Sequence, residues 1–448
     1  MSGLRDPALD LLARAARRAG VRAYAVGGYV RDSMLGLAPH ELDVVVVGGD
    51  ALALATRFAE LAGASRPVLF PRFGTAQVTL GRRRVEFATA RRESYAEDSR
   101  KPQVEPATLD EDLRRRDFTV NAMVMDTEGQ ILDPLGGRED LGRRLLRTPE
   151  DPDRTFADDP LRMLRAVRFA AQLDFTLDPP LLPAMRRMAE RARPPVLSVE
   201  RVQEELRKLL VTDRPRKGLG LMAEGGLMAV LLPELEACRG VAQGGWDRDD
   251  VFDHTLDAVQ QTAPDLRLRL AALFHDIGKP PTAGPGFTFY GHDRVGAEMT
   301  EAVMERLRFP HALIADVVSL VRMHMRPIQY RSDWGAGAVR RLARDGGELV
   351  GPLLDLARAD VAASDYPNTD EIEELAGRLV EAEQETPSRL RVPVDGRDIM
   401  GVLGIGPGPA VGRAKSRLEE MVLDGHLEPD RDAILAYLRE HPELAEGA

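Results

Sequence analysis

The hydrophobic pattern of the first ninety residues alternates between helical and strand-like periods. Apolar residues recur at helical spacing as far as Gly20, and a second helical stretch covers residues 50–62. Short runs of strand-forming residues predict strands at 24–26, 41–47, 68–70, 75–80 and 84–88. The pattern therefore predicts a small sheet with helices packed on it.

Two carboxylates share one side of the predicted strand at 41–47. Glu41 and Asp43 are two residues apart, so they project together while the apolar residues next to them point into a core. Mg²⁺ prefers a few carboxylates plus substrate phosphate oxygens. Gly27 and Gly28 come just before, and paired glycines let the backbone approach a phosphate closely. Glu86, on the strand at 84–88, faces away from the core and is either a third carboxylate for the metal or a solvent-facing residue.

This combination resembles the DNA polymerase β nucleotidyltransferase superfamily. That superfamily has a Gly-Gly turn, a short helix and then two acids separated by one apolar residue. The first acid is more commonly Asp there, and it is Glu41 here. The resemblance implies a site that holds a nucleoside triphosphate on Mg²⁺.

The polar stretch at 91–112 predicts a mobile loop, because it contains Lys-Pro and Glu-Pro pairs and lacks a hydrophobic period. Three successive arginines, Arg114 to Arg116, follow it. Such a cluster suits a triphosphate or an RNA backbone, and a solvated helix end is the alternative.

Residues 141–217 predict helices broken at prolines, and a set of histidines and aspartates follows from 218 onward. Neutral imidazoles and carboxylates are ligands for Mn²⁺, Ni²⁺, Fe²⁺ or Mg²⁺. Their order matches the HD phosphohydrolase superfamily. The residues of this predicted metal site are His254, His275, Asp276, His292, His324 and Asp360.

Length and composition add bounds to these predictions. A chain of 448 residues is long enough for two to four domains. Its single cysteine, Cys238, and the absence of a signal-like or 18-residue apolar run indicate a cytoplasmic protein with no membrane span. Net charge is −11, yet residues 1–217 carry 37 Lys and Arg against 33 Asp and Glu. The front half could therefore bind a polyanion.

Three further segments resemble bacterial class II tRNA nucleotidyltransferases, which are the CCA-adding enzymes and their poly(A) polymerase relatives. The segments are 115–122 (Arg-Arg-Asp-Phe-Thr-Val-Asn-Ala), 158–169 and 200–208. The second corresponds to the nucleotide-selecting helix of the family, with Asp158 where the family usually has Glu. The nucleotide-binding residues that the resemblance implies are Gly27, Gly28, Arg31, Arg115, Arg116, Asp117, Asn121, Asp158, Asp159, Arg162, Arg165 and Arg168, with Asp117 near the ribose.

Asp159 and Arg162 are three apart, which predicts that they share one face of a helix. A carboxylate accepts from an exocyclic amine and a guanidinium donates to ring acceptors, so the pair could imitate a Watson-Crick partner for C or A. The alternative is an ordinary surface salt bridge.

The expected fold class is α+β: a polymerase β-like nucleotidyltransferase head with a small mixed sheet (1–140), an all-α neck (141–217), an HD domain (218–370) and a helical, RNA-binding tail (371–448). The expected reaction adds C and/or A from CTP and ATP to the 3′ end of tRNA, with Mg²⁺ at the head. Phosphodiesterase or phosphatase activity is expected at the HD site, with Ni²⁺, Mn²⁺ or another divalent metal. Whether CCA, CC or only A is added, and the oligomeric state, are left open.

Three other functions are compatible with the sequence. A protein-modifying nucleotidyltransferase with an HD domain would have both metal sites, but not the segments at 115–122 and 158–169. A hydrolase whose head survives only as an RNA-binding module, or a poly(A) polymerase, would also carry most of these motifs.

Overall fold

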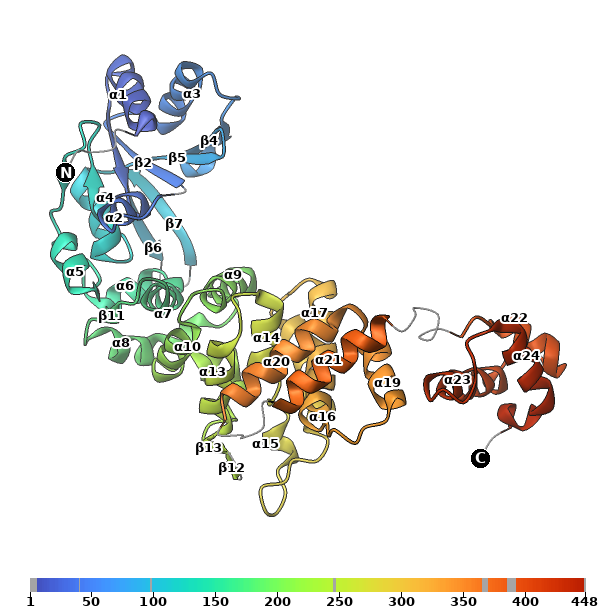
Figure 1. Cartoon of the computed structure of the whole chain (residues 1–448). Helices are drawn as coiled ribbons and strands as arrows, with labels where there is room; N and C mark the ends of the chain where they lie inside the picture. The colour runs from blue at the N-terminus through green and yellow to red at the C-terminus, as the bar shows by residue number, and fades with distance from the viewer. Residues whose placement is uncertain are drawn as a thin grey trace. The chain divides into compact units, whose positions relative to one another are not determined.

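The computed structural model describes residues 6–39, 41–96, 99–244, 247–364, 370–384 and 392–446. The chain forms two compact units, Met1–Pro233 and Glu234–Ala448, each described here by itself. The first unit contains the sheet and the helices that follow it, and the second is almost wholly helical (Figure 1).

A seven-stranded mixed sheet forms the centre of the head, in the order β3-β4-β5-β2-β1-β8-β9. Strands β2 and β5 are parallel, and the other neighbours are antiparallel. The elements of the head are α1 (Pro7–Ala19), β1 (Arg22–Val26), α2 (Gly28–Met34), β2 (Glu41–Val47), α3 (Ala51–Ala62), β3 (Val68–Phe70), β4 (Thr75–Leu80), β5 (Arg83–Thr89), β6 (Arg91–Ala96), β7 (Ser99–Pro106), α4 (Leu109–Arg114), β8 (Val124–Met125), β9 (Ile131–Leu132) and α5 (Gly137–Arg143).

The two faces of this sheet differ in what covers them. Helices α1 and α3 lie side by side over one face, where Phe87 of β5 packs against Phe58 of α3 (Figure 1). Asp43 and Glu86 are partners in the register of β2 and β5, so both project from the opposite face. The alternation of polar and apolar residues therefore places the carboxylates on the face that α1 and α3 leave open.

The segment at 91–106 forms a hairpin, so the prediction of a loop there was wrong. Strand β6 pairs with β7 as a separate two-stranded sheet, with Arg91 opposite Pro106 and Glu93 opposite Val104. A two-stranded ribbon gives no hydrophobic alternation to detect, because neither of its faces must be covered by a core. Its prolines are tolerated because a ribbon consists of edge strands only.

The neck follows as a set of helices. Helix α7 packs against both α9 and α10, and its middle is buried on most sides. The elements are β10 (Leu145–Leu146), α6 (Pro152–Asp158), α7 (Leu161–Leu173), β11 (Thr176–Leu177), α8 (Leu181–Met188), α9 (Val199–Leu210), α10 (Pro215–Glu224) and α11 (Leu227–Leu231), with α12 (Pro233–Glu236) at the junction.

The second unit contains a bundle of helices and a small tail with its own core. The tail core is formed by side chains such as Ile399, Leu418 and Ile434 from its three helices. The elements are β12 (Ala242–Gly244), β13 (Asp247–Asp250), α13 (Val251–Gln261), α14 (Leu266–Phe274), α15 (Lys279–Thr282), α16 (His292–Arg306), α17 (His311–Met323), α18 (Met325–Ile328), α19 (Ala336–Gly346), α20 (Val350–Ala362), α21 (Asp370–Gln384), α22 (Gly396–Leu403), α23 (Pro409–Leu423) and α24 (Arg431–Glu440).

The expected fold class is confirmed: a mixed-sheet head is followed by helical domains. Within the described ranges, no helix is both long enough and apolar enough to cross a membrane.

Gly27 joins β1 to α2 with φ 73° and ψ −134°. Residues other than glycine rarely adopt this backbone conformation. Gly27→Ala is therefore expected to lower the free energy of unfolding by about 1–3 kcal/mol. Denaturant unfolding of the two proteins measures this difference.

Gly28→Ala is the matched control. Gly28 is helical, and an added methyl group would have as its nearest neighbour the Arg31 Nη2 atom at 3.6 Å, an ordinary contact. Equal losses of stability in the two variants would contradict a conformational requirement specific to Gly27.

Candidate active site and metal centre

The carboxylates of the head lie on the open face of the sheet. The side chains of Glu41 and Glu86 are 56% and 50% exposed, and Arg84 Nη1 lies 3.3 Å from Glu41 Oε1 and 4.0 Å from Glu86 Oε1. Asp43 is more buried. Burial and the nearby charges of Glu86 and Glu41 raise the pKa of Asp43 to about 6, although Arg116 opposes the shift. A bound cation would offset the burial and the charge repulsion, and it would thereby stabilise the charged form of Asp43.

The Gly27 turn faces this carboxylate directly. A methyl group at Gly27 would lie 3.5 Å from Asp43 Oδ2 and 3.6 Å from Arg116 Nη1. The missing side chain thus keeps backbone, carboxylate and guanidinium close together. A phosphate group bound to a cation would find both partners here. The Asp43 carboxylate would bind the cation, and the Arg116 guanidinium would bind the phosphate.

Arg115 and Arg116 are oriented by a buried aspartate that the sequence analysis missed. Asp112 has no exposed surface, and it lies 2.6 Å from Arg115 Nη2 and 3.1 Å from Arg116 Nη2. Burial favours the neutral acid, yet both guanidinium groups lower the pKa of Asp112. By contrast, Arg114 points outward and pairs with Asp110 on the surface.

Asp117 is a buried junction between the head and the neck. Its Oδ1 accepts from the backbone N–H of Phe118 and from Asn121, and its Oδ2 lies 2.6 Å from Arg165 Nη2 on α7. Burial alone would raise the pKa of Asp117, but the Arg165 charge and the hydrogen bonds hold it at about 2. Both oxygens are therefore committed within the protein.

Three guanidinium groups gather around the ring of Phe169. Arg31, Arg165 and Arg168 lie 5.0, 5.2 and 4.0 Å from its centroid. Arg31 is only 4% exposed and donates to Asn121 Oδ1 at 2.7 Å. These arginines, expected to bind nucleotide, thus form a packed layer linking α2 to α7.

The expectation that Asp159 and Arg162 share a helix face was wrong. Helix α6 ends at Asp158 and α7 begins at Leu161, so Asp159 lies in the break between them. Its carboxylate accepts from the backbone N–H of Leu161 at 3.0 Å. Pro160 separates the helices, since a proline disfavours helical geometry in the residue before it.

Arg162 is 9% exposed and donates to two backbone carbonyls. Its partners are Thr155 O at 3.2 Å and Arg115 O at 2.5 Å. Arg162 thereby fastens the neck to the segment that carries Arg115 and Arg116. Asp158, at the end of α6, is half-buried.

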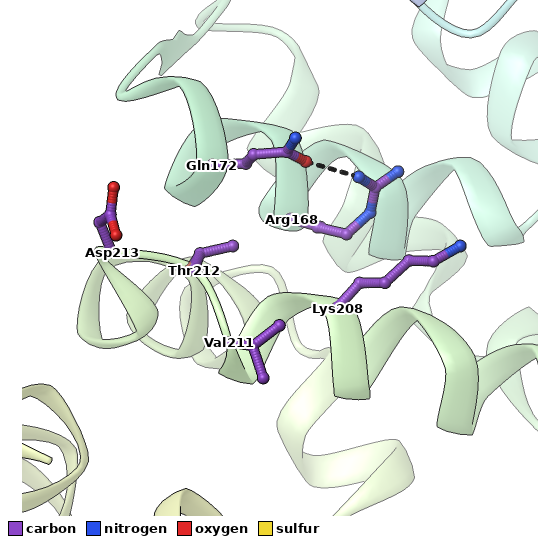
Figure 2. Close-up of a pocket in the computed structure, with 6 residues that line it drawn as sticks. All are labelled: Arg168, Gln172, Lys208, Val211, Thr212 and Asp213. Carbon is purple, nitrogen blue, oxygen red and sulfur yellow. Dashed lines mark hydrogen bonds between the residues drawn. The ribbon is translucent and has the colours of Figure 1, made fainter. Parts of the chain in front are cut away.

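A pocket of about 480 Å³ opens between α7 and α9 (Figure 2). Arg168 lines it and is held by Gln172 Oε1 at 2.8 Å and by the buried Glu205. Lys208 extends along its other side. This pocket lies in the neck and does not include the carboxylates of the sheet.

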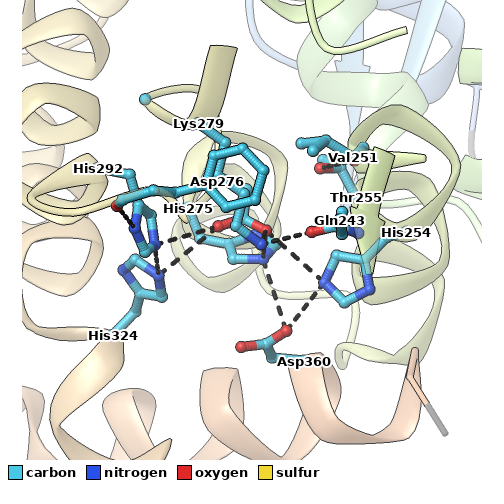
Figure 3. Close-up of polar contacts among 12 residues, drawn as sticks. Gln243, Val251, His254, Thr255, His275, Asp276, Lys279, His292, His324 and Asp360 are labelled. Carbon is cyan, nitrogen blue, oxygen red and sulfur yellow. Dashed lines mark hydrogen bonds and ion pairs between the residues drawn. The ribbon is translucent and has the colours of Figure 1, made fainter. Parts of the chain in front are cut away.

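The second unit brings all six residues of the predicted HD site together (Figure 3). Asp276 and His275 lie at the centre, with His292 and His324 on one side and His254 with Asp360 on the other. Ligand atoms within 4.8 Å of one another form two groups, His254–His275–Asp276 and Asp276–His292–His324. Asp276 belongs to both.

The histidines of this cluster are oriented for coordination. The Nδ1 atoms of His275, His292 and His324 lie 2.8, 2.8 and 2.6 Å from backbone carbonyl oxygens. A carbonyl accepts only from a protonated nitrogen, so Nδ1 carries a proton in each ring. Nε2 is then the ring atom that faces Asp276 and that would bind a metal. The donor set fits a divalent transition metal.

Charge in the cluster depends on its two carboxylates. Burial would lower the pKa of His275, but Asp276 and Asp360 raise it. Burial and the neighbouring His275 lower the pKa of His324 to about 4, which keeps it a neutral ligand. Lys279, which the sequence analysis missed, lies 2.6 Å from Asp276 Oδ2. Its position one helical turn after Asp276 was the available signal.

Among the described residues, this HD cluster alone contains three ligand atoms so close together. The three carboxylates of the head lie further apart. That arrangement suits Mg²⁺, which takes one or two carboxylates and completes its shell with water and substrate oxygens.

The fold and these two centres define a nucleotidyltransferase head joined to a metal-binding HD domain. Family models agree along the chain: "Poly A polymerase head domain" matches residues 23–147, "Probable RNA and SrmB- binding site of polymerase A" matches 174–239, and "HD domain" matches 251–366. The chain is 36% identical to the A-adding tRNA nucleotidyltransferase of Deinococcus radiodurans over 92% of its own length and 94% of that protein. It is also 36% identical to the CC-adding tRNA nucleotidyltransferase of Thermus thermophilus, over 93% and 94%.

The chain therefore belongs to the tRNA nucleotidyltransferase and poly(A) polymerase family, and it is a nucleotidyltransferase with an HD domain. These relatives favour the RNA-directed interpretation over the protein-modifying one. Domains of both kinds work with divalent metals.

Two solved structures have a fold similar to that of this chain. The CCA-adding enzyme of Bacillus stearothermophilus in complex with CTP has a TM-score of 0.71 at 24% identity, covering 98% of both chains. A tRNA nucleotidyltransferase complexed with a primer tRNA and an incoming ATP analog has a TM-score of 0.57 at 27% identity, covering 84% of this chain and 99% of that one.

Asp43→Asn is expected to abolish nucleotide transfer while stabilising the metal-free fold. The pKa of about 6 lies above the ordinary 3.8, so the charged carboxylate costs stability above pH 6 and nothing below pH 3.8. The gain of the variant should reach at most about 3 kcal/mol at pH 8 and fade between pH 6 and 4. Incorporation of labelled nucleotide and urea unfolding in EDTA measure the two effects.

Glu60→Gln, an exposed carboxyl of α3 on the opposite face, should change neither property. Near-normal transfer by folded Asp43→Asn would contradict the assigned site.

Proposed function

We propose that the head adds C and/or A, from CTP and ATP, to the 3′ end of tRNA. The observation that carries this proposal is the meeting of Gly27, Asp43 and Arg116 on the open face of the sheet. The relatives, which are A-adding and CC-adding tRNA nucleotidyltransferases, supply the class of substrate.

The reaction forms one phosphorus–oxygen bond and breaks another. The 3′-hydroxyl oxygen of the RNA attacks the α-phosphorus, and the hydroxyl proton passes to solvent. The bond from the α-phosphorus to the bridging oxygen breaks, and pyrophosphate leaves with the electron pair. Little covalent chemistry falls to the protein, so positioning and charge stabilisation dominate. Mg²⁺ at Asp43 and Glu41 would lower the pKa of the attacking hydroxyl and neutralise the triphosphate.

The residues of the head have different proposed roles, according to whether they face the site or lie behind it. Gly27, Gly28 and Arg116 would contact the triphosphate. Arg115 lies next to Arg116, because both arginines pair with the buried Asp112. Glu86 is available as a third carboxylate. Arg31 and Asn121 act as positioning residues, because they bond to each other behind the site.

Base selection is proposed for the break between α6 and α7, with Asp158 at the end of α6, Asp159 in the break and Arg162 in the first turn of α7. The carboxylate of Asp159 lies at the break between the helices, where Arg201 Nη2 approaches its Oδ2 at 3.4 Å. Arg162 acts by holding the Arg115 carbonyl and hence the shape of the base pocket. Arg165 and Arg168 would hold α7 in place beside this base pocket, through their ion pairs with Asp117 and Glu205.

The decisive experiment follows the products. Purified protein with Mg²⁺, CTP and ATP is given tRNA transcripts that lack the whole CCA end, the final CA or only the final A, and the extended RNA is sequenced. Extension of one or more of these transcripts supports the proposal and tells CCA, CC and A addition apart. Labelling of protein instead of RNA, or no extension of any RNA, would overturn it.

We also propose that the HD centre hydrolyses phosphate esters at RNA or nucleotide ends, such as 2′,3′-cyclic phosphates. Its buried, preoriented imidazoles favour Ni²⁺ or Mn²⁺ over Mg²⁺. A cation there would supply an activated water, and Lys279 would balance the charge of Asp276.

His275→Ala combined with Asp276→Ala should remove bound metal and hydrolysis of 2′,3′-cyclic phosphate, and should spare nucleotide transfer. Each centre has its own ligands, so each can lose its ion alone. Metal analysis after chelation and Ni²⁺ or Mn²⁺ add-back, with both activity assays, measures this. His311→Ala, an exposed histidine of α17, is the control. Loss of transfer in the folded double variant would show that the centres are coupled.

Arg162→Ala is expected to weaken discrimination against UTP and GTP, because it releases the Arg115 carbonyl that shapes the proposed base pocket. The charged hydrogen bond that is lost is worth about 1.5–3 kcal/mol, so the loss of discrimination should not exceed about 10- to 150-fold. Ratios of kcat/KM among the four nucleotides measure it. Arg187→Ala removes an exposed neck arginine paired with Asp153 and should have no effect. Unchanged discrimination in Arg162→Ala would remove this residue from base selection.

A further inference from the structure

An exposed apolar strip occupies the free edge of the head sheet. Strand β3 is the edge strand, and Val68, Phe70 and, just beyond it, Phe73 are 55%, 41% and 57% exposed. We call these three residues the β3 patch. Large aromatic side chains this exposed on a sheet edge invite contact with another molecule.

The register of the sheet places Val68 and Phe70, the two patch residues of β3, on the same face as the carboxylates. Asp43 pairs with Glu86, Glu86 with Gln77 and Gln77 with Val68. Residues paired across neighbouring strands project to the same side, and Phe70 follows Val68 by two. Three strand spacings of about 4.8 Å place Val68 about 14 Å from Asp43.

The chain segment around the patch is rich in arginine, although Arg83 and Arg84 pair with Asp6 and Glu41. Residues 63–91 contain six arginines and a single acidic residue, Glu86. Arg72 lies 5.9 Å from the Phe73 ring centroid, and Arg91 Nη1 donates to the Phe73 carbonyl at 3.0 Å. Arg66, just before β3, is exposed. Exposed aromatic rings among arginines are the composition of surfaces that bind single-stranded nucleic acid.

We propose that the β3 patch is a stacking platform for unpaired bases at the 3′ end of the RNA substrate. A stacked strand advances about 3.4 Å per nucleotide and an unstacked one advances further, so at most about four nucleotides would span the distance between Asp43 and Val68. A base on Phe70 or Phe73 would hold the end in line with the attack at Asp43, and arginines would contact the backbone. This inference rests on the proposed transfer to RNA.

The test compares KM values for RNA and for nucleotide. With the tRNA transcript that the wild-type protein extends, Phe70→Ala combined with Phe73→Ala should raise the KM for RNA by about 5- to 150-fold per lost stacked base. The KM for nucleotide and kcat at saturating RNA should change less than twofold. Phe73→Trp, which preserves a stacking surface, should keep the wild-type KM for RNA, and its fluorescence should be quenched by RNA.

Leu69→Ala is the matched control, since Leu69 lies on the same strand but projects from the other face. An unchanged KM for RNA in the double variant would overturn the inference while leaving the proposed function intact. Failure of the wild-type protein to extend RNA would instead refute that function. Conversion of a wild-type dimer to a monomer by the double variant, seen by light scattering, would show that a second copy covers the patch and would also overturn the inference.

Discussion

The ion pair between the buried Asp117 and the partly exposed Arg165 is the interaction on which the arrangement of the first unit depends. It joins the end of the arginine-rich segment to α7, and the same carboxylate orders Asn121, which in turn binds Arg31. Phe169 supplies the surface over which the guanidinium groups pack. Removing Arg165 would leave the Asp117 charge buried without this partner, and such a loss typically costs about 3–5 kcal/mol. The proposed nucleotide site thus depends for its shape on the residues that lie behind it.

The two metal-binding centres follow opposite designs. In the head, the exposed Glu41 and Glu86 leave room for a substrate to complete the shell of a hard cation. In the HD cluster, imidazoles fixed by backbone carbonyls converge on the buried Asp276, so the protein itself supplies most ligands. An ion at the first centre would therefore arrive with its substrate, whereas an ion at the second would be held by the domain itself. With such different ligands, the two centres would not compete for the same metal.

The head sheet separates structure from chemistry by its faces. One face is covered by α1 and α3, where residues such as Phe58 and Phe87 form the core. The other carries the carboxylates in one line of the register with Val68 at the edge. A substrate can therefore reach the metal and the edge strand from the same side without disturbing the core. The strand alternation that builds the sheet also builds the active surface.

The sequence by itself determined the elements whose signals are local. Strands β3 and β4, the helix ending at Gly20 and the ligand set of the HD domain follow from periodicity, capping and residue order. Only the tertiary structure decided what depends on partners distant in the chain. Asp112 and Phe169 became visible as organisers only when buried among arginines, and Arg162 proved to bind backbone carbonyls. The hairpin at 91–106 was also not predicted from the sequence. Strands that pair without burying one face leave no hydrophobic pattern in a single sequence.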